Sequence, residues 1–300
     1  MKSDIVDVFE RQNDQLAKLF RELSNRNVYY FPNHGNAGDS LIAAATYQLL
    51  KHYNIKYGVR STTDEALAIK DSIILLGGGG NLVPLYKGMA ALVRAATKGN
   101  NHVVLMPHSV RGHADLLAGL PNSMTVYCRE EMSFQHARSL AKDANVILGH
   151  DLGLYADMEK IESEYIDSDA RKNFAELLAQ HTKLTPLQLE GRKVSCIRGG
   201  GEATIKVAGP NYDISVIFKG AVTPGKAELS AWMLFEFTRL AGEVMTNRLH
   251  VGIAAALAKT PTRLYDNNYG KLSGVYVHSM QERFPYVKFE GEMLKHDPYA

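Results

Sequence analysis

The chain of 300 residues is poor in cysteine, in net charge and in long apolar runs. Its two cysteines, Cys128 and Cys196, each lie in an apolar strand-like run, so we interpret them as buried thiols of a reducing compartment. A net charge of +2 without a long basic run argues against nucleic acid binding. No segment approaches the roughly 18 apolar residues of a membrane span. The N-terminus combines acidic residues with no continuous apolar core, so we expect no signal peptide and a cytoplasmic protein.

What is present is typical of a folded α/β protein. Hydrophobic residues make up 45% of the chain and charged residues 22%, and the length suggests roughly two domains. Short apolar runs alternate with helical patterns, which predicts βαβ units and a parallel sheet. In the first half the predicted strands are 28–31, 72–76, 103–106, 125–128 and 146–148, and the predicted helices are 3–24, 41–51, 89–98, 113–119 and 130–141.

A second alternation follows a polar connecting segment at 159–192. Its predicted strands are 194–197, 214–218, 243–245 and 263–265, with helices at 227–240 and 249–258. The predicted fold is therefore α/β with two Rossmann-like domains, residues 1–158 and 193–300, whose parallel sheets face a cleft. We leave open whether the final segment, 279–300, packs back on the first domain.

The most informative segment is the loop 33–42, which follows a predicted strand and opens a predicted helix. A strand that feeds a helix N-terminus through a glycine-bearing turn presents backbone N–H groups, which suits an anion such as phosphate. Gly35 and Gly38 permit close approach of the backbone, and Asp39 stands where a helix N-cap would be. An ordinary strand–helix turn with an Asp cap is the alternative.

Four consecutive glycines, Gly77 to Gly80, follow the predicted strand 72–76. Such a run is costly in chain entropy, which indicates backbone packed close to a ligand or to the loop at Gly35 and Gly38. It is neither a Walker loop nor a dinucleotide fingerprint, because the required spacing and following residues are absent. A tight strand-to-helix crossover is the alternative.

The segment 246–250 places Arg248 and His250 between a predicted strand and the N-terminus of a predicted helix. An arginine fork binds carboxylate or phosphate, and a histidine can transfer a proton near neutral pH. Arg129 and Arg198 also follow predicted strands, and the polar loop 266–271 ends another. The pattern collects groups that bind anions. We expect no metal, since no zinc-type His or Cys pairing occurs, and we find no nucleophile elbow.

Taken in order, five segments resemble the polysaccharide pyruvyl transferase family. They span about residues 28 to 280 and are Gly35–Asp39, Gly77–Asn81, Cys128–Glu130, Thr246–His250 and Asp266–Lys271. The resemblance implies a two-domain fold like that of GT-B glycosyltransferases. It also implies transfer of a pyruvyl group from phosphoenolpyruvate to a sugar of an exopolysaccharide or other cell-surface glycan precursor, forming a pyruvate ketal, with no cofactor.

The resemblance also implies roles for individual residues. Asp39 and His250 are the predicted catalytic residues, Asp39 as general base and His250 as phosphate ligand or general acid. The predicted substrate-binding residues are Asn36, Gly38, Gly78, Gly79, Asn81, Arg129, Arg198, Arg248, Leu249, Asn267 and Lys271. Arg129 and Arg198 compete for one cationic role. Asn247 departs from the family, in which many relatives have Asp beside the arginine.

The implied partners are phosphoenolpyruvate and a glycan or lipid-linked oligosaccharide. A lipid-linked acceptor would bring the enzyme to the inner face of the plasma membrane as a peripheral protein. Two other functions stay open from the residues: a nucleotide-sugar-dependent glycosyltransferase of the same architecture, and a non-catalytic glycan-binding relative. Contacts to a base and ribose would indicate the first, and loss of turnover with the fold retained would indicate the second.

Overall fold

A computed structural model describes residues 15–199, 205 and 207–293 of the chain. Its contacts divide these residues into two compact units. The first comprises 15–33 and Ala45–Tyr155, and the second comprises His34–Ala44 together with the described residues from Ala156 to 293. Helix α3 (Ala37–His52) therefore begins in the second unit and ends in the first.

The first unit is built on a seven-stranded sheet in which every pairing is parallel. Its order is β2-β1-β3-β5-β6-β7, and β4 pairs with β5 beside this path. The strands are β1 (Asn27–Phe31), β2 (Lys56–Val59), β3 (Ile73–Leu76), β4 (Gly79–Leu82), β5 (His102–Val110), β6 (Met124–Cys128) and β7 (Asn145–Leu148). The five predicted strands are confirmed, whereas β2 and β4 were not predicted.

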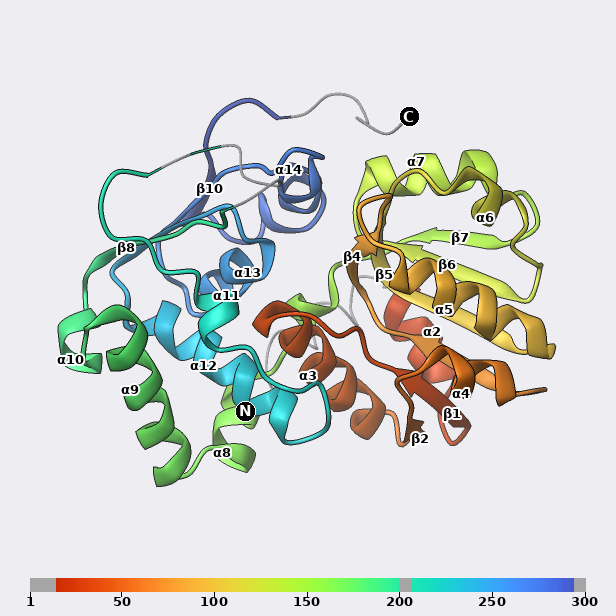
Figure 1. The fold of residues 1–300 in the computed structure, drawn as a ribbon, viewed down its shortest axis with the longest axis horizontal. Coiled ribbons are helices and arrows are strands. Elements are labelled where there is room, and N and C mark those ends of the chain that lie inside the picture. The colour runs from red at the N-terminus through yellow and green to blue at the C-terminus, as the bar shows by residue number, and fades with distance from the viewer. Residues whose placement is uncertain (1–14, 200–204, 206, 294–300) are drawn as a thin grey trace. The chain divides into compact units, whose positions relative to one another are not determined.

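Helices cover both faces of this sheet (Figure 1). One face packs its Ile74, Leu105 and Val126 against α4 to α7 in a single apolar core. On the other face the Tyr30 ring meets Tyr47 of α3 edge-on, with 5.4 Å between centroids, and the Tyr127 hydroxyl donates to the Gln15 carbonyl of α2 at 3.4 Å. The helices are α2 (Gln15–Glu22), α3, α4 (Thr63–Ala68), α5 (Gly88–Ala96), η1 (Thr97–Gly99), α6 (Ala114–Ala118), α7 (Glu131–Leu140) and η2 (Leu152–Tyr155). Coverage of both faces explains why β3 and β5 are nearly continuous apolar runs.

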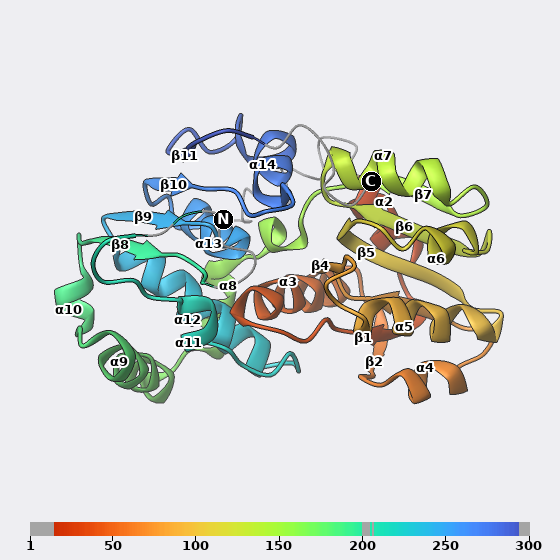
Figure 2. The ribbon, with the colours of Figure 1, turned by 45° about the horizontal axis from the view of Figure 1, so that its top comes forward.

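The second unit contains a four-stranded parallel sheet of order β11-β10-β9-β8 (Figure 2). Its strands are β8 (Lys193–Cys196), β9 (Glu243–Thr246), β10 (Thr262–Leu264) and β11 (Val287–Phe289). Strand β11 lies in the final segment 279–300 and pairs with β10, so this part of the segment belongs to the second unit. Residues 294–300 lie outside the described residues. The prediction of an α/β fold with parallel sheets is confirmed.

An aromatic cluster forms part of the core of the second unit. The Phe174 ring lies 5.5 Å from Phe218 and 5.6 Å from Trp232, and Phe218 lies 6.1 Å from Phe237. The helices are α8 (Met158–Tyr165), α9 (Ser168–Thr182), α10 (Pro186–Leu189), α11 (Ile214–Ile217), α12 (Lys226–Leu240), α13 (Leu249–Leu257), α14 (Lys271–Val275) and η3 (Tyr276–Met280). The segment 159–192, predicted as a connection, thus carries helices that pack in this core. The predicted domain boundaries stay a prediction.

One predicted strand, 214–218, is wrong. The structure has helix α11 over Ile214–Ile217, closed by hydrogen bonds from Ile217 N to Asp213 O and from Phe218 N to Ile214 O. Ile214 and Phe218 are buried while Val216 is 56% exposed, which is the spacing of a helical turn. Packing of Phe218 in the aromatic cluster outweighs the β propensity of this apolar run.

No helix among the described residues is long and apolar enough to cross a bilayer.

Candidate functional site

The first turn of α3 is closed by side chains of its own segment. Asn36 Oδ1 accepts the Gly38 N–H at 2.8 Å, and Asp39 Oδ2 accepts the Asn36 N–H at 2.8 Å. A Cβ at Gly35 would lie 2.0 Å from Asp39 Oδ2, so a larger residue would displace the carboxylate. Asp39 is therefore not the N-cap residue predicted from the sequence; it stands one turn in and reaches back to Asn36, as an acidic residue of a capping box does. Its role as a base stays a prediction.

Gly38 lies directly against His250. A Cβ at position 38 would stand 2.4 Å from His250 Nδ1 and 2.7 Å from its Cβ and Cγ. Both residues belong to the second unit, because the chain from His34 to Ala44 is part of it. The structure thus brings together two predicted motifs, the loop 33–42 and the segment 246–250, and the absence of a side chain at Gly38 leaves room for the half-buried imidazole.

Arg248 stands at the N-terminus of α13 and forms an ion pair with Asp213. The Arg248 side chain is 12% exposed and that of Asp213 is 28% exposed, and Nη2 of the arginine donates to Oδ2 of the aspartate. Arg248 Nε and Asp213 Oδ1 are buried without a hydrogen-bond partner among the described residues. The Arg248 side chain makes no capping hydrogen bond to α13, and Leu249, the first residue of the helix, is buried.

Arg198 and Arg248 follow the adjacent parallel strands β8 and β9, as the sequence predicted. Asn247 fixes the Arg198 backbone, since its Oδ1 accepts the Arg198 N–H at 2.7 Å and its Nδ2 donates to the Arg198 carbonyl at 3.4 Å. The side chain of Asn247 is buried. An aspartate could accept from the N–H but could not donate to the carbonyl, which gives Asn247 a structural reason at this position.

The loop 266–271 follows β10 at the same edge of this sheet. Asp266 Oδ1 accepts the backbone N–H groups of Asn267 at 2.9 Å and of Leu272 at 3.2 Å, so this carboxylate closes the N-terminus of α14. Asn267 Oδ1 accepts the Lys271 N–H at 3.0 Å, while Asn267 Nδ2 is buried without a partner among the described residues. Lys271 Nζ donates to the Tyr269 hydroxyl at 2.9 Å. Ligand contacts by Asn267 and Lys271 stay a prediction.

The glycine run 77–80 of the first unit leads into strand β4 and packs against Asn33. A Cβ at Gly77 would lie 2.5 Å from the Asn33 backbone N, and one at Gly79, where φ is +154°, would lie 2.4 Å from Asn33 Nδ2. Close packing at Gly77 and Gly79 is confirmed, but the neighbour is Asn33 and not the predicted pair Gly35 and Gly38. Contact of the run with a ligand stays a prediction. Gly78 is buried between them.

A neutral polar cluster adjoins this strand. Asn81 Nδ2 donates to Asn33 Oδ1 at 2.8 Å, and His108 Nε2 lies 2.8 Å from Asn81 Oδ1. Burial, together with the smaller effect of the nearby Arg129 charge, lowers the pKa of His108 to about 3. The imidazole is therefore neutral at physiological pH, and the cluster offers hydrogen bonds without charge.

Arg129 occupies a buried ion pair behind this cluster. Its Nη1 donates to Asp151 Oδ2 at 2.7 Å and its Nε donates to Ser109 Oγ at 2.9 Å, and both charged side chains are at most 1% exposed. A second buried pair joins Arg111 to Glu130 at 3.1 Å. The predicted place of Arg129 after a strand is confirmed, but its guanidinium is engaged by Asp151, and a donor contact stays a prediction.

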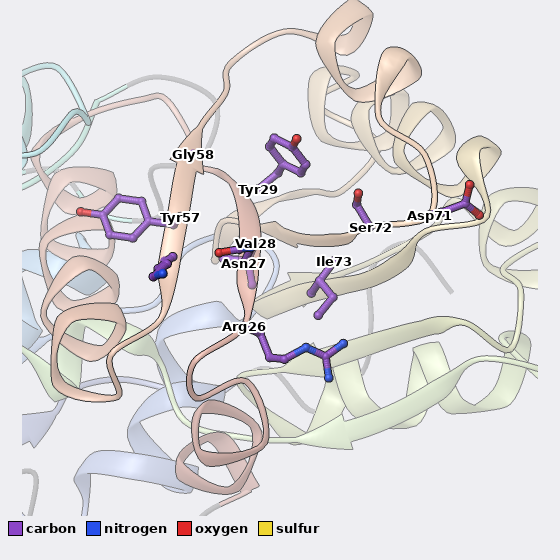
Figure 3. A pocket seen from close by; sticks show the side chains of 10 residues that line it. Arg26, Asn27, Val28, Tyr29, Tyr57, Gly58, Asp71, Ser72 and Ile73 are labelled. Atoms are coloured by element: carbon purple, nitrogen blue, oxygen red, sulfur yellow. The ribbon is translucent and has the colours of Figure 1, made fainter.

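A hollow of about 620 Å³ opens at the opposite edge of the first sheet, where β1, β2 and β3 begin (Figure 3). Its lining includes Arg26, Tyr29, Lys56, Tyr57 and Ser72, and none of the predicted site residues. Ligands of parallel α/β sheets bind at the carboxyl ends of the strands. We therefore do not assign the hollow to the site. Within the described part of the chain, no group of three His, Cys, Asp or Glu side chains could hold a metal ion.

A comparison of the sequence with known protein families shows to which family the chain belongs. Residues 36–269 match the family described as polysaccharide pyruvyl transferase, which is more than half of the chain. The chain belongs to this family. The polysaccharide pyruvyl transferase family supports a role in pyruvyl transfer during glycan biosynthesis, with a glycan as acceptor.

The fold of this chain is also found in a solved structure. The protein KP1_0663 from Klebsiella pneumoniae subsp. pneumoniae NTUH-K2044, described as uncharacterized, is similar at 27% identity and a TM-score of 0.73, over 95% of this chain and 99% of that one. A dipicolinate synthase subunit from Bacillus halodurans aligns at 12% identity over 90% of each chain, with a TM-score of 0.24, too low to support any argument. No curated protein matches the chain.

Sequence reasoning did not select three residues that the structure places beside predicted ones: Asp213, His108 and Asn33, the last of which begins the predicted loop 33–42 but received no role of its own. His108 and Asn33 each follow a predicted strand, so the rule that ligands gather at carboxyl strand ends could have found them. Asp213 had no such signal, because the run after it was predicted as a strand and its contact with Arg248 spans distant segments.

Proposed function

We propose that this protein transfers a pyruvyl group from phosphoenolpyruvate to a sugar of an exopolysaccharide or other cell-surface glycan precursor, forming a pyruvate ketal. The observation that carries the proposal is the set of Arg248, His250 and Arg198 in one unit, at the carboxyl ends of adjacent strands and beside the N-terminus of α13. Phosphoenolpyruvate carries a carboxylate and a phosphate, so it needs two cationic groups and backbone N–H donors.

The chemistry assigns a role to each group. A sugar hydroxyl adds to C2 of the enol while C3 takes up a proton, and the C2–O bond to phosphate then breaks, so that phosphate leaves. A second hydroxyl of the sugar adds to C2, loses its proton and closes the ketal. In this proposal Arg248 and Arg198 hold the anionic donor, and His250 binds the phosphate or supplies the proton. Charge held in place around the departing phosphate is the main expected catalytic contribution.

Asp39 is the proposed base toward the sugar hydroxyl. Its Oδ2 accepts the Asn36 N–H, and Gly38, the residue before it, lies against His250, so acid and base candidates share one unit. Their location in one unit supports the separate roles that the family resemblance implied for Asp39 and His250. A carboxylate has about four lone-pair sites, so the contact with Asn36 does not by itself prevent a contact with substrate.

The decisive experiment incubates the protein with phosphoenolpyruvate and a panel of synthetic or lipid-linked glycosides. Phosphate release and acceptor mass are followed together, and the expected product carries one pyruvyl group for each phosphate released. Arg248→Ala should abolish phosphate release, with the thermal unfolding curve of the fold retained. The proposal fails if acceptor mass increases without phosphoenolpyruvate, or if Arg248→Ala turns over at the rate of the unmodified protein.

The same panel separates the alternatives. Mass gain only with a nucleotide sugar would indicate a glycosyltransferase, and binding of glycans without turnover would indicate a non-catalytic relative. A GT-B-like arrangement of the two halves, a cytoplasmic location and peripheral association with the inner face of the membrane belong to this proposal. A lipid-linked acceptor that is used better than its soluble analogue would support the last of these.

A further inference from the structure

The orientation of Arg248 depends on a carboxylate, and the neighbouring residue does not supply it. Asn247 is neutral, and both polar atoms of its side chain are hydrogen-bonded to the Arg198 backbone. The carboxylate that Arg248 contacts comes from Asp213, which lies on a separate segment of the chain. The pair is partly buried, where an ion pair is screened less by solvent and salt than at the surface.

Asp213 is placed like a helix cap but does not act as one. It directly precedes α11, yet its side chain makes no capping hydrogen bond to that helix. Aspartate at such a position normally accepts from the helix N–H groups, and that contact stabilises the helix. Here the carboxylate is directed to Arg248 instead, at the expense of local stability.

The segment that carries Asp213 is fixed to the sheet. Asn211 accepts the Ile197 N–H at 2.8 Å and donates to the Ile197 carbonyl at 2.8 Å. One residue on, the Tyr212 N–H donates to the Ser195 carbonyl at 2.8 Å. These bonds hold the backbone before Asp213 against the end of β8, so the carboxylate reaches Arg248 from a rigid base.

The contact leaves donor capacity on the guanidinium. Only Nη2 of Arg248 is paired within the described residues, so Nη1 makes no hydrogen bond there, and Nε is buried without a partner. A long side chain whose fork is held at one nitrogen loses less conformational freedom when the other nitrogens bind an anion. Asp213 therefore prepares Arg248 for a ligand without occupying all of its donors.

We propose that Asp213 is a positioning residue for the donor site: it holds the Arg248 guanidinium at Nη2 so that the N–H groups of Nη1 receive the anionic donor. This inference rests on the proposed function. Removal of a negative charge beside an anion site would by itself strengthen anion binding, whereas loss of positioning weakens it. The two effects of removing Asp213 have opposite signs, which makes the inference testable.

The test measures the dissociation constant of phosphoenolpyruvate by calorimetry for the unmodified protein and for Asp213→Asn. We expect binding to weaken by about tenfold, because Arg248 would no longer be held in place for one charge-assisted hydrogen bond to the donor. In an Arg248→Lys background the same change should weaken binding less than about twofold, because the fork to be positioned is gone. Thermal unfolding of Asp213→Asn should stay close to that of the unmodified protein, since Asp213 caps nothing.

Glu243→Gln is the matched control. Glu243 lies at the opposite end of β9, where its carboxylate pairs with Lys193 at 2.7 Å and with Arg263 at 2.7 Å. Its loss removes an ion-paired carboxylate of the same unit and should leave donor binding unchanged. Equal or tighter binding by Asp213→Asn would overturn the inference alone, as would a lower unfolding temperature with unchanged binding. Failure of the unmodified protein to bind phosphoenolpyruvate would overturn the proposed function and the inference together.

Discussion

At the scale of single residues, Gly38 is the position where one methyl group has the largest expected effect. In Gly38→Ala the new Cβ would stand within 2.7 Å of three His250 atoms, two of which, Cβ and Cγ, cannot move aside without moving the ring. We expect kcat for pyruvyl transfer to fall on the order of 100-fold, because small displacements of a catalytic group have costs of that size. Steady-state assay of phosphate release measures it.

Gly88→Ala is the control for this substitution. Gly88 opens α5, and a Cβ there would meet nothing within 4 Å. Its expected effect is unchanged turnover and a slight gain in stability, as for alanine in a helix. Equal turnover of the two variants would show that His250 tolerates a side chain at position 38.

Substitution of Arg129 and of Arg198, the two candidates for one cationic role, should affect different properties of the protein: stability for Arg129 and donor binding for Arg198. Arg129→Met leaves Asp151 buried and uncompensated, so the free energy of unfolding should fall by about 3–5 kcal/mol. Arg198→Met removes a partly exposed side chain, so we expect an unfolding free energy within about 0.5 kcal/mol of the unmodified protein. For Arg198→Met we instead expect a KM for phosphoenolpyruvate that is roughly tenfold higher. Urea unfolding and donor titration of both variants decide it, and the reverse pattern would move the donor contact to Arg129.

At the scale of elements, His108, which lies where strand β5 pairs with β4, should make the stability of the protein depend on pH. The folded protein keeps His108 neutral down to a pKa of about 3, whereas the unfolded chain protonates it near its ordinary value of 6.5. As pH falls below 6.5, His108 is therefore protonated in the unfolded state but not in the folded state, and the free energy of unfolding decreases. Between pH 7 and pH 5 this amounts to about 2 kcal/mol.

The measurement is urea unfolding at the two pH values for the unmodified protein and for His108→Gln. Glutamine can still hydrogen-bond to Asn81 but does not titrate. The variant should therefore lose about 2 kcal/mol less stability on acidification than the unmodified protein. An equal loss in both proteins would show that His108 becomes protonated in the folded state well above pH 3.

Elements also show where sequence patterns were sufficient. Alternating apolar runs and helical patterns predicted β1, β3, β5 to β10 and the long helices α3, α5, α12 and α13, because burial on both faces of a parallel sheet leaves a strong signal. Strand β4 was missed because the glycine run 77–80, which overlaps its start, carries no apolar pattern, although Gly79 pairs with His108. Helix α11 was predicted as a strand, since β-branched residues favour a strand unless packing decides otherwise.

At the scale of the whole molecule, the sequence could place several candidate residues at strand ends but could not predict their contacts. Arg198, Arg248 and His250 could be placed at strand ends because a parallel sheet directs all its carboxyl ends to one edge. The contacts of Gly38 with His250 and of Asp213 with Arg248 could not, because each joins distant segments through packing that no local pattern encodes. The buried pairing of Arg129 with Asp151 is of the same kind.

The division of α3 between the two units constrains how related genes can recombine. The unit that holds Arg248 and His250 is encoded in two separate stretches, His34–Ala44 and the region after Ala156. A single crossover near Ala156 would join the His250 of one parent to the Gly38 turn of another, and a fragment starting there would lack that turn altogether. Functional chimaeras should therefore require the exchange of both stretches together.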